Sequence, residues 1–199
     1  MEIENATQQR ILEVATNVFY QKGLAGARMQ EIADLSGINK AMLHYYYTTK
    51  EQLFDKVFQR TFFMYIGSIS RLLSTASPFK EKLWNFIDEV MDMLQKYPYI
   101  PVFILHELNQ NPARISELFS ESQAINFEEF KREVAREVRR GNIKKVKAEQ
   151  LFTDLIALTV LPFVAQPILS KVLSKNHEQY SQFLQDRKKE LKTNWLENL

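Results

Sequence analysis

Cysteine is missing from this sequence of 199 residues, and its absence excludes several kinds of chemistry at once. Disulfide bonds, thiolate metal sites and cysteine nucleophiles all require it. A chain without disulfides fits a reducing compartment, so we expect a cytoplasmic location. The first ten residues are polar and lack the apolar segment of a secretory signal, which agrees with that expectation.

Long apolar runs are lacking as well. The longest nearly uncharged stretch lies between Asp154 and Lys171, and it is interrupted by Pro162, Gln166 and Pro167. Its purely apolar part is too short to cross a bilayer, because a transmembrane helix needs about 20 such residues. We therefore expect a buried helix in this stretch and no membrane partner.

A marked excess of charge of either sign is also absent. Lys and Arg number 26 against 24 Asp and Glu, which gives a formal net charge of +2. Residues 1–50 contain five of each sign. Bulk charge therefore gives no argument for nucleic acid binding, and any such argument depends on where individual charges lie.

Helical periodicity extends over most of the sequence. Apolar residues recur at spacings of three and four, and there is no convincing strand alternation. Thr48 and Glu51 predict a capping box at the start of a long helix. About nine helices are expected in all, near residues 10–22, 29–36, 39–47, 51–72, 78–94, 102–108, 122–140, 147–161 and 178–196.

The composition shifts near residue 50, which divides the chain. We expect an all-α protein with a small three-helix domain at residues 5–50. A larger helical domain is expected at residues 51–199.

The segment 28–47 has the spacing of a helix-turn-helix. This motif needs a short first helix, a turn residue that tolerates positive φ, a small residue where the helices cross, and apolar residues that pin the second helix. The residues at those positions are Ile32, Ala33, Gly37, Ile38 and Leu43. The alternative is a plain helical hairpin inside an all-helical core. A structural helix would more often carry Glu and Lys pairs on its outer face, whereas this one presents Lys40, Ala41, His44, Tyr45 and Lys50.

At this point a resemblance to a known family is plain. The stretch GINKAMLHYYYTTKE, residues 37–51, resembles the signature of TetR-family transcription regulators. The resemblance covers about residues 7–55, and beyond them only the size and the helical pattern agree. It implies a homodimer whose two recognition helices enter the major groove of a palindromic double-stranded DNA operator. The DNA-binding residues implied are Arg28, Met29, Gln30, Asn39, Lys40, Ala41, Met42, His44, Tyr45, Tyr46 and Lys50.

The resemblance also assigns roles to these residues. Lys40, Ala41 and Met42 would lie near bases, and Lys50 at a phosphate. Three positions depart from the family pattern. Arg28 stands where Ser or Thr is common, and it can donate to a phosphate at a helix start although it cannot accept a capping bond. His44 stands where Tyr is common, which leaves the operator sequence unpredicted. The third departure is Tyr47, which stands in place of Phe and is expected in the core with its hydroxyl near the surface.

The larger domain is rich in bulky apolar residues. Most of these belong to a core, but ligand pockets are lined by the same chemistry with a few polar anchors. Under the resemblance, an unidentified small, largely apolar effector would bind among the fourth to eighth helices. The candidate residues are Phe62, Trp84, Ile87, Met91, Phe103, His106, Glu107, Phe127 and Leu158; His106 can equally be a hydrogen-bonded core or surface histidine.

Two late helices are candidates for dimerisation. The helix at about 151–161 is apolar nearly all round, which argues for burial on two sides, against its own core and against a partner. Related family members pair two such helices into a four-helix bundle. The predicted interface consists of Leu151, Leu155, Leu158, Tyr180, Phe183, Leu184, Arg187 and Leu191. The alternative is that both helices simply close the core of one chain.

Enzymatic motifs are missing. The three histidines, His44, His106 and His177, form no HExxH motif, and neither a P-loop nor a GxGxxG pattern occurs. We expect no enzyme, no cofactor and no metal site. The function predicted is a ligand-responsive regulator, most simply a repressor that releases DNA when an effector binds. A helical adaptor without DNA binding and a TetR-like activator are the alternatives.

Overall fold

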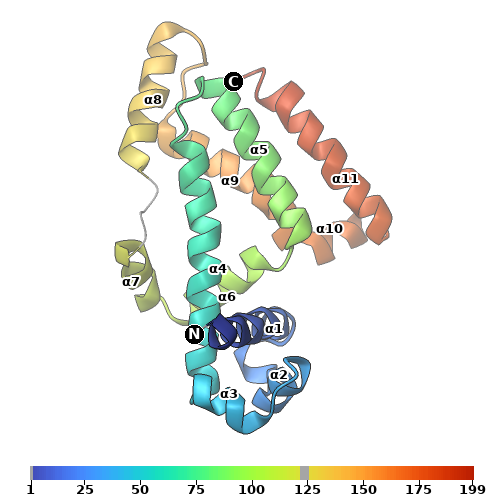
Figure 1. Cartoon of the computed structure of the whole chain (residues 1–199). Helices are drawn as coiled ribbons and strands as arrows, with labels where there is room; N and C mark the ends of the chain where they lie inside the picture. The colour runs from blue at the N-terminus through green and yellow to red at the C-terminus, as the bar shows by residue number, and fades with distance from the viewer. Residues whose placement is uncertain (1, 122–125) are drawn as a thin grey trace.

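The structure is a computed structural model that describes residues 2–121 and 126–199. Within these ranges every regular element is a helix and there are no strands, which confirms the all-α prediction (Figure 1). The helices are α1 (Glu2–Gly26), α2 (Met29–Leu35), α3 (Lys40–Tyr46), α4 (Lys50–Leu73), α5 (Phe79–Lys96), α6 (Ile100–Gln110), α7 (Ala113–Glu121), α8 (Phe127–Arg140), α9 (Ala148–Val164), α10 (Gln166–Val172) and α11 (His177–Glu190), followed by a π-helical turn at Leu191–Trp195.

The described residues contain two helices more than the nine that the sequence predicts. Both are short: α7 has nine residues and α10 has seven. The helix expected at 147–161 is longer at its end, since α9 continues through Pro162 to Val164. The predicted start of a helix near residue 122 lies outside the described residues, and α8 is capped at Asn126, whose side chain accepts from the Glu129 amide at 3.1 Å.

The longest apolar stretch of the sequence forms two helices, α9 and α10, with a bend between them. The two helices are bent by 76° relative to each other. No single helix among residues 2–121 and 126–199 is long and apolar enough to cross a membrane. Only this bent pair, taken together, reaches the required length and composition.

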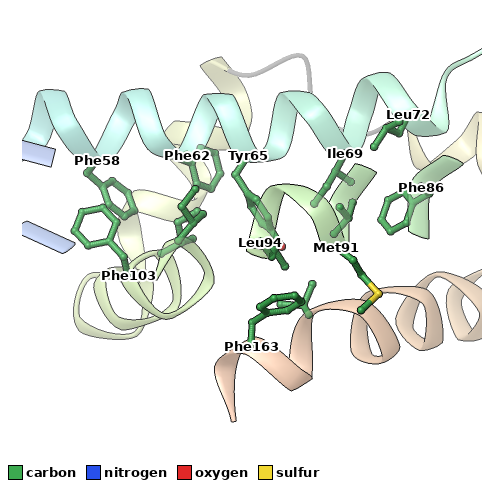
Figure 2. Packing of buried hydrophobic residues seen from close by; sticks show 14 of the residues in the cluster. Phe58, Phe62, Tyr65, Ile69, Leu72, Phe86, Met91, Leu94, Phe103 and Phe163 are labelled. Carbon is green, nitrogen blue, oxygen red and sulfur yellow. The ribbon is translucent and has the colours of Figure 1, made fainter. Parts of the chain in front are cut away.

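The long helix α4 organises the molecule. Its lower end lies beside α1 and α3, and its upper part runs between α5 and α8 (Figure 1). Its buried face is formed by Phe58, Phe62, Tyr65, Ile69 and Leu72, which recur every three or four residues as an amphipathic helix requires. Figure 2 shows these side chains against Phe103 of α6, Met91 and Leu94 of α5, and Phe163 of α9. Burial raises the pKa of Tyr65 to about 12.

Two local caps fix the start of α3 and of α4. The Asn39 side chain accepts from the Met42 amide at 2.7 Å, and the Thr49 hydroxyl accepts from the Gln52 amide at 3.1 Å. The Gln52 side chain in turn accepts from the Thr48 amide at 2.9 Å. The capping box predicted for Thr48 and Glu51 is therefore wrong by one residue, because Thr49 rather than Thr48 holds the extended backbone of the cap.

The turn between α2 and α3 gives the first prediction. Gly37 has φ 66°, and a Cβ there would lie 2.9 Å from a guanidinium nitrogen of Arg10. We expect Gly37→Ala to lower the free energy of unfolding by about 1–2 kcal/mol in urea titrations, because an L residue is strained at this φ. Gly67→Ala is the matched control: this glycine lies in α4 with nothing near its Cβ position, so the same change should stabilise the protein by about 0.5–1 kcal/mol. Equal stability of the Gly37→Ala variant and the wild type would contradict the strain argument.

Candidate nucleic-acid interface

The packing predicted for the helix-turn-helix is present. Ile32, Ala33 and Leu43 are fully buried, and Ile38 is half-buried rather than buried. The turn is closed by the Gly37 amide, which donates to the Asp34 carbonyl, and by the Ile38 amide, which donates to the Ala33 carbonyl, both at 3.1 Å. These contacts fix the crossing of α2 and α3, and they do not involve the outer face of α3.

The outer face of α3 is polar and aromatic. Lys40, Ala41 and His44 are exposed, Met42 is 40% exposed, and Tyr45 is 75% exposed. A tyrosine so exposed gains little from apolar burial, which suits a contact with a partner better than a role in the core. Its ring meets the half-buried ring of Tyr46 edge-on, with centroids 5.3 Å apart, and this contact restrains it.

The α2 residues of the predicted site lie at the start of that helix. Arg28 is the N-cap residue, is exposed, and makes no side-chain capping bond. Met29 is half-buried, and Gln30 donates to Asp34 at 2.8 Å. An exposed guanidinium at a helix start, where backbone N–H groups point outward, suits an anion such as a phosphate.

Three predicted side chains are held by the protein itself. Asn39 is committed to the cap of α3. A ring nitrogen of His44, Nδ1, lies 3.0 Å from the Thr48 carbonyl oxygen. The ammonium group of Lys50 is half-buried and donates to the Ala27 carbonyl at 3.2 Å. Lys50 thereby fastens the start of α4 to the segment before α2, a structural contact that the sequence did not predict.

The prediction for Tyr47 was half correct. Its ring belongs to the core, but the hydroxyl oxygen is buried as well and does not lie near the surface. Burial raises the pKa of this hydroxyl.

Two contacts of α1 were not predicted from the sequence. Lys22 pairs with Glu31 of α2 at 2.5 Å, and Arg10 lies against Gly37. No local pattern indicates either contact.

The predicted effector residues are divided between the core and separate pockets. Phe62, Ile87 and Met91 are buried core residues, and Phe127 and Leu158 are half-buried. Trp84 is 37% exposed, and the Lys192 ammonium lies 4.4 Å from its ring centre. Trp84 lines a surface pocket of about 380 Å³ with Lys80 and Leu196. Phe103 and His106 line a different pocket.

That second pocket lies between the N-terminal helices and the rest of the chain. Its volume is about 490 Å³, and its lining includes Lys50, Phe54, Phe103, His106 and Glu107. His106 is exposed there, whereas Glu107 is buried and bonded to Asn111 at 2.8 Å and to Arg114. Glu107 is thus no free anchor for an effector, and the prediction for it is corrected.

The predicted dimer residues divide into two groups. Leu158, Phe183 and Arg187 are half-buried, and the Arg187 Nε donates to the Leu158 carbonyl at 3.2 Å. The other residues are buried inside the single chain, so they offer no surface to a partner and the prediction for them is wrong. These are Leu151, Leu155, Tyr180, Leu184 and Leu191. Helical periodicity identified them as inward-facing, but their neighbours are α5 and the rest of the same chain.

Ionisable groups elsewhere give no sign of a metal centre. Within residues 2–121 and 126–199, no group of three or more histidine, aspartate or glutamate side chains could hold a metal ion.

Comparisons with known proteins agree with this geometry. Residues 11–57 match the model of the family described as bacterial regulatory proteins, tetR family. The negative transcriptional regulator IcaR of the icaADBC biofilm operon from Staphylococcus aureus is 24% identical over 179 residues, which cover 88% of this chain and 92% of IcaR.

Solved structures share the fold along most of the chain. FadR from Bacillus subtilis, in complex with stearoyl-CoA, superposes with a TM-score of 0.62 at 14% identity and covers 93% of this chain and 97% of its own. AibR, in complex with isovaleryl coenzyme A and operator DNA, superposes with a TM-score of 0.60 at 20% identity and covers 79% and 85%. The buried helix-turn-helix, the exposed face of α3 and the family match over the same residues lead to one conclusion: residues 11–57 form a helix-turn-helix domain of the TetR family of bacterial regulatory proteins.

Proposed function

We propose that the chain regulates transcription as a homodimer that binds a palindromic operator, and that a small, largely apolar effector changes its affinity for that operator. The DNA-binding domain would comprise residues 5–50, with the effector-binding and dimerisation domain at 51–199. One observation carries the proposal. The outer face of α3 exposes Lys40, Met42, His44 and Tyr45, while the inner face of the same helix is anchored by Leu43.

The chemistry of this face suits a DNA groove. Lys40 and Arg28 are exposed cations that can neutralise phosphates, and Tyr45 can pack against sugar and donate a hydrogen bond. Met42 and Ala41 offer apolar contact to base edges such as the thymine methyl group. In a dimer, the two α3 helices would need to lie about 34–36 Å apart to enter successive major grooves.

Exposed apolar groups support dimerisation near α9 and α10. Leu161 is 56% exposed at the end of α9, and Ile168 and Val172 are exposed on α10. The half-buried Leu158 and Phe183 of the original prediction remain candidates beside them. Apolar surface of this kind is costly to leave in water, and a second copy of the chain would cover it.

The proposed effector rests on the solved relatives. FadR was crystallised with stearoyl-CoA, and AibR with isovaleryl coenzyme A and operator DNA. An acyl group suits the large apolar side chains around α4. By linkage, if the effector lowers the affinity of the protein for DNA, DNA must lower its affinity for the effector by the same factor. Repression follows most simply from operator binding, and activation is the alternative within the same fold.

A helical adaptor is the alternative from another class of protein. It would use the exposed apolar residues of α9 and α10 for protein partners and would not require the α3 face. Selection of DNA from a random pool by the purified protein separates the two. A palindromic motif supports the proposed function, and a pool that shows no enrichment excludes it.

The exposed residues of α2 and α3 lead to a prediction on DNA affinity and sequence specificity. We expect Lys40→Ala and Arg28→Ala to weaken binding to selected and random DNA alike, and each to reduce the slope of log K against log salt by about 0.9, since each removes about one phosphate contact. Met42→Ala should instead change the selected motif. Fluorescence anisotropy at several salt concentrations measures this, with the exposed α10 residue change Lys171→Ala as control. A Lys40→Ala variant with unchanged affinity and an altered motif would reverse the assignment.

The dimer surface gives a prediction on assembly. We expect Leu161→Asp to shift the protein to monomer in analytical ultracentrifugation, because a carboxylate would be buried without a partner at the contact. Leu35→Asp is the matched control, since Leu35 is 57% exposed on α2, in the N-terminal part of the chain. If Leu161→Asp remains as dimeric as the control, the contact lies elsewhere.

The effector gives a prediction on affinity. Stearoyl-CoA or isovaleryl-CoA should lower the affinity for the selected DNA by about tenfold, within the range that allosteric coupling usually reaches. Coenzyme A without an acyl chain is the control. If neither acyl-CoA changes DNA binding while the protein still selects a motif, acyl-CoA is not the effector class.

A further inference from the structure

Arg114 joins three helices at the boundary between the N-terminal helices and the rest of the chain. It lies on α7, and its guanidinium pairs both with Asp55 of α4 and with Glu107 of α6. The guanidinium carbon also lies 5.2 Å from the centre of the Phe58 ring. Planar guanidinium groups bind two carboxylates and stack on aromatic faces at once, which an ammonium group cannot do.

The contact with Glu107 is buried. Glu107 is only 7% exposed, and its other partner is the Asn111 amide at 2.8 Å. Burial alone would lower the pKa of Arg114, but the two carboxylates more than offset this and raise it. The guanidinium therefore stays charged, and its removal would leave a buried carboxylate without a countercharge.

The contact with Asp55 reaches α4, the helix that follows α3 and begins at Lys50. Asp55 lies in the second turn of α4, next to Phe54, whose ring packs edge-on against Phe19 of α1 at 5.1 Å. Lys50 of the same helix is fastened to Ala27, directly before α2. A displacement of α7 thus has a direct path of polar contacts to the base of α4, and from there to the helix-turn-helix.

The surroundings leave the ion pairs room to rearrange. Asp55, Glu107 and Arg114 line a surface groove of about 460 Å³, together with Pro112 and Glu117. The Asp55 side chain is about half exposed, and that of Arg114 is 23% exposed. A partly solvated ion pair contributes little stability by itself, so its value here lies in fixing the relative position of helices.

We propose that Arg114 is a positioning residue that couples α7 to the orientation of the DNA-binding helices through Asp55. This inference rests on the proposed function for its DNA readout only. Without this ion pair, helices α1 to α3 would sample more orientations relative to α7, and only a fraction of them would suit the operator. The apparent Kd rises by the inverse of that fraction.

The first test measures DNA affinity. Arg114→Gln, Asp55→Asn and the double variant are compared on the selected DNA site, after circular dichroism shows that each is folded. We expect each single variant to raise Kd at least about fivefold, corresponding to a competent fraction near 0.2. The double variant should be no weaker than the weaker single one, because the two changes remove one shared interaction. Asp55→Asn leaves Glu107 paired, so it remains informative if Arg114→Gln is unstable.

A matched ion pair on the same helix supplies the control. Arg71 of α4 pairs with Glu89 of α5 at 2.7 Å, far along the helix from α1. Arg71→Gln removes the same chemical group and should leave the Kd within about twofold of wild type. The inference is overturned if Arg114→Gln and Asp55→Asn behave like Arg71→Gln.

The second test does not require DNA. Because the chain has no cysteine, Leu35→Cys and His177→Cys create the only two spin-label sites, on α2 and at the start of α11. Pulsed electron resonance on labelled chains diluted with unlabelled protein gives the distance between them. Arg114→Gln should broaden this distribution, and Arg71→Gln should not. An unchanged distribution overturns the coupling. If the wild type selects no DNA, the proposed function fails. The distance measurement alone then tests whether Arg114 fixes the orientation of the N-terminal helices.

Discussion

The fold depends on one helix that is shared between two packing units. The first turns of α4 bury Leu53 and Phe54 against α1, and its later turns bury Tyr65, Ile69 and Leu72 among α5 and α9. A continuous helix transmits orientation because its hydrogen-bonded backbone resists bending. The position of helices α1 to α3 therefore depends on how α4 packs against the later helices, and any signal between the two parts has to act on α4 or on the side chains that touch it.

Buried and exposed residues of the helix-turn-helix have different roles. Leu43 and Ile32 fix where α3 lies, and their burial supplies the stability. The residues that would meet DNA contribute little to that stability, because they are exposed. Their chemistry is consequently free to specify a DNA sequence. Asn39 and Lys50 are predicted DNA contacts that also have a structural role. The side chain of each forms a hydrogen bond with a backbone group of the same domain.

The corrections to the predicted effector and dimer residues have a common reason. Periodicity identified Leu151, Tyr180 and Ile87 as inward-facing residues, and the structure does bury them. It gives no information about what covers an inward face, because a core, a ligand and a second chain all present apolar surface. The exposed Leu161 and Ile168 are better candidates for contacts with a partner. Their exposure depends on the bend between α9 and α10, which the sequence did not predict.

The sequence by itself determined the helix-turn-helix, since its signals are local. Ile32, Ala33, Gly37 and Leu43 lie within twelve consecutive residues, and each has a requirement that short-range geometry imposes. Only the tertiary structure decided that Lys50 reaches Ala27 and that Arg114 reaches Asp55. These partners are 23 and 59 residues apart in the chain. Contacts over such separations depend on how whole helices pack, and the spacing of residues along one helix contains no record of them.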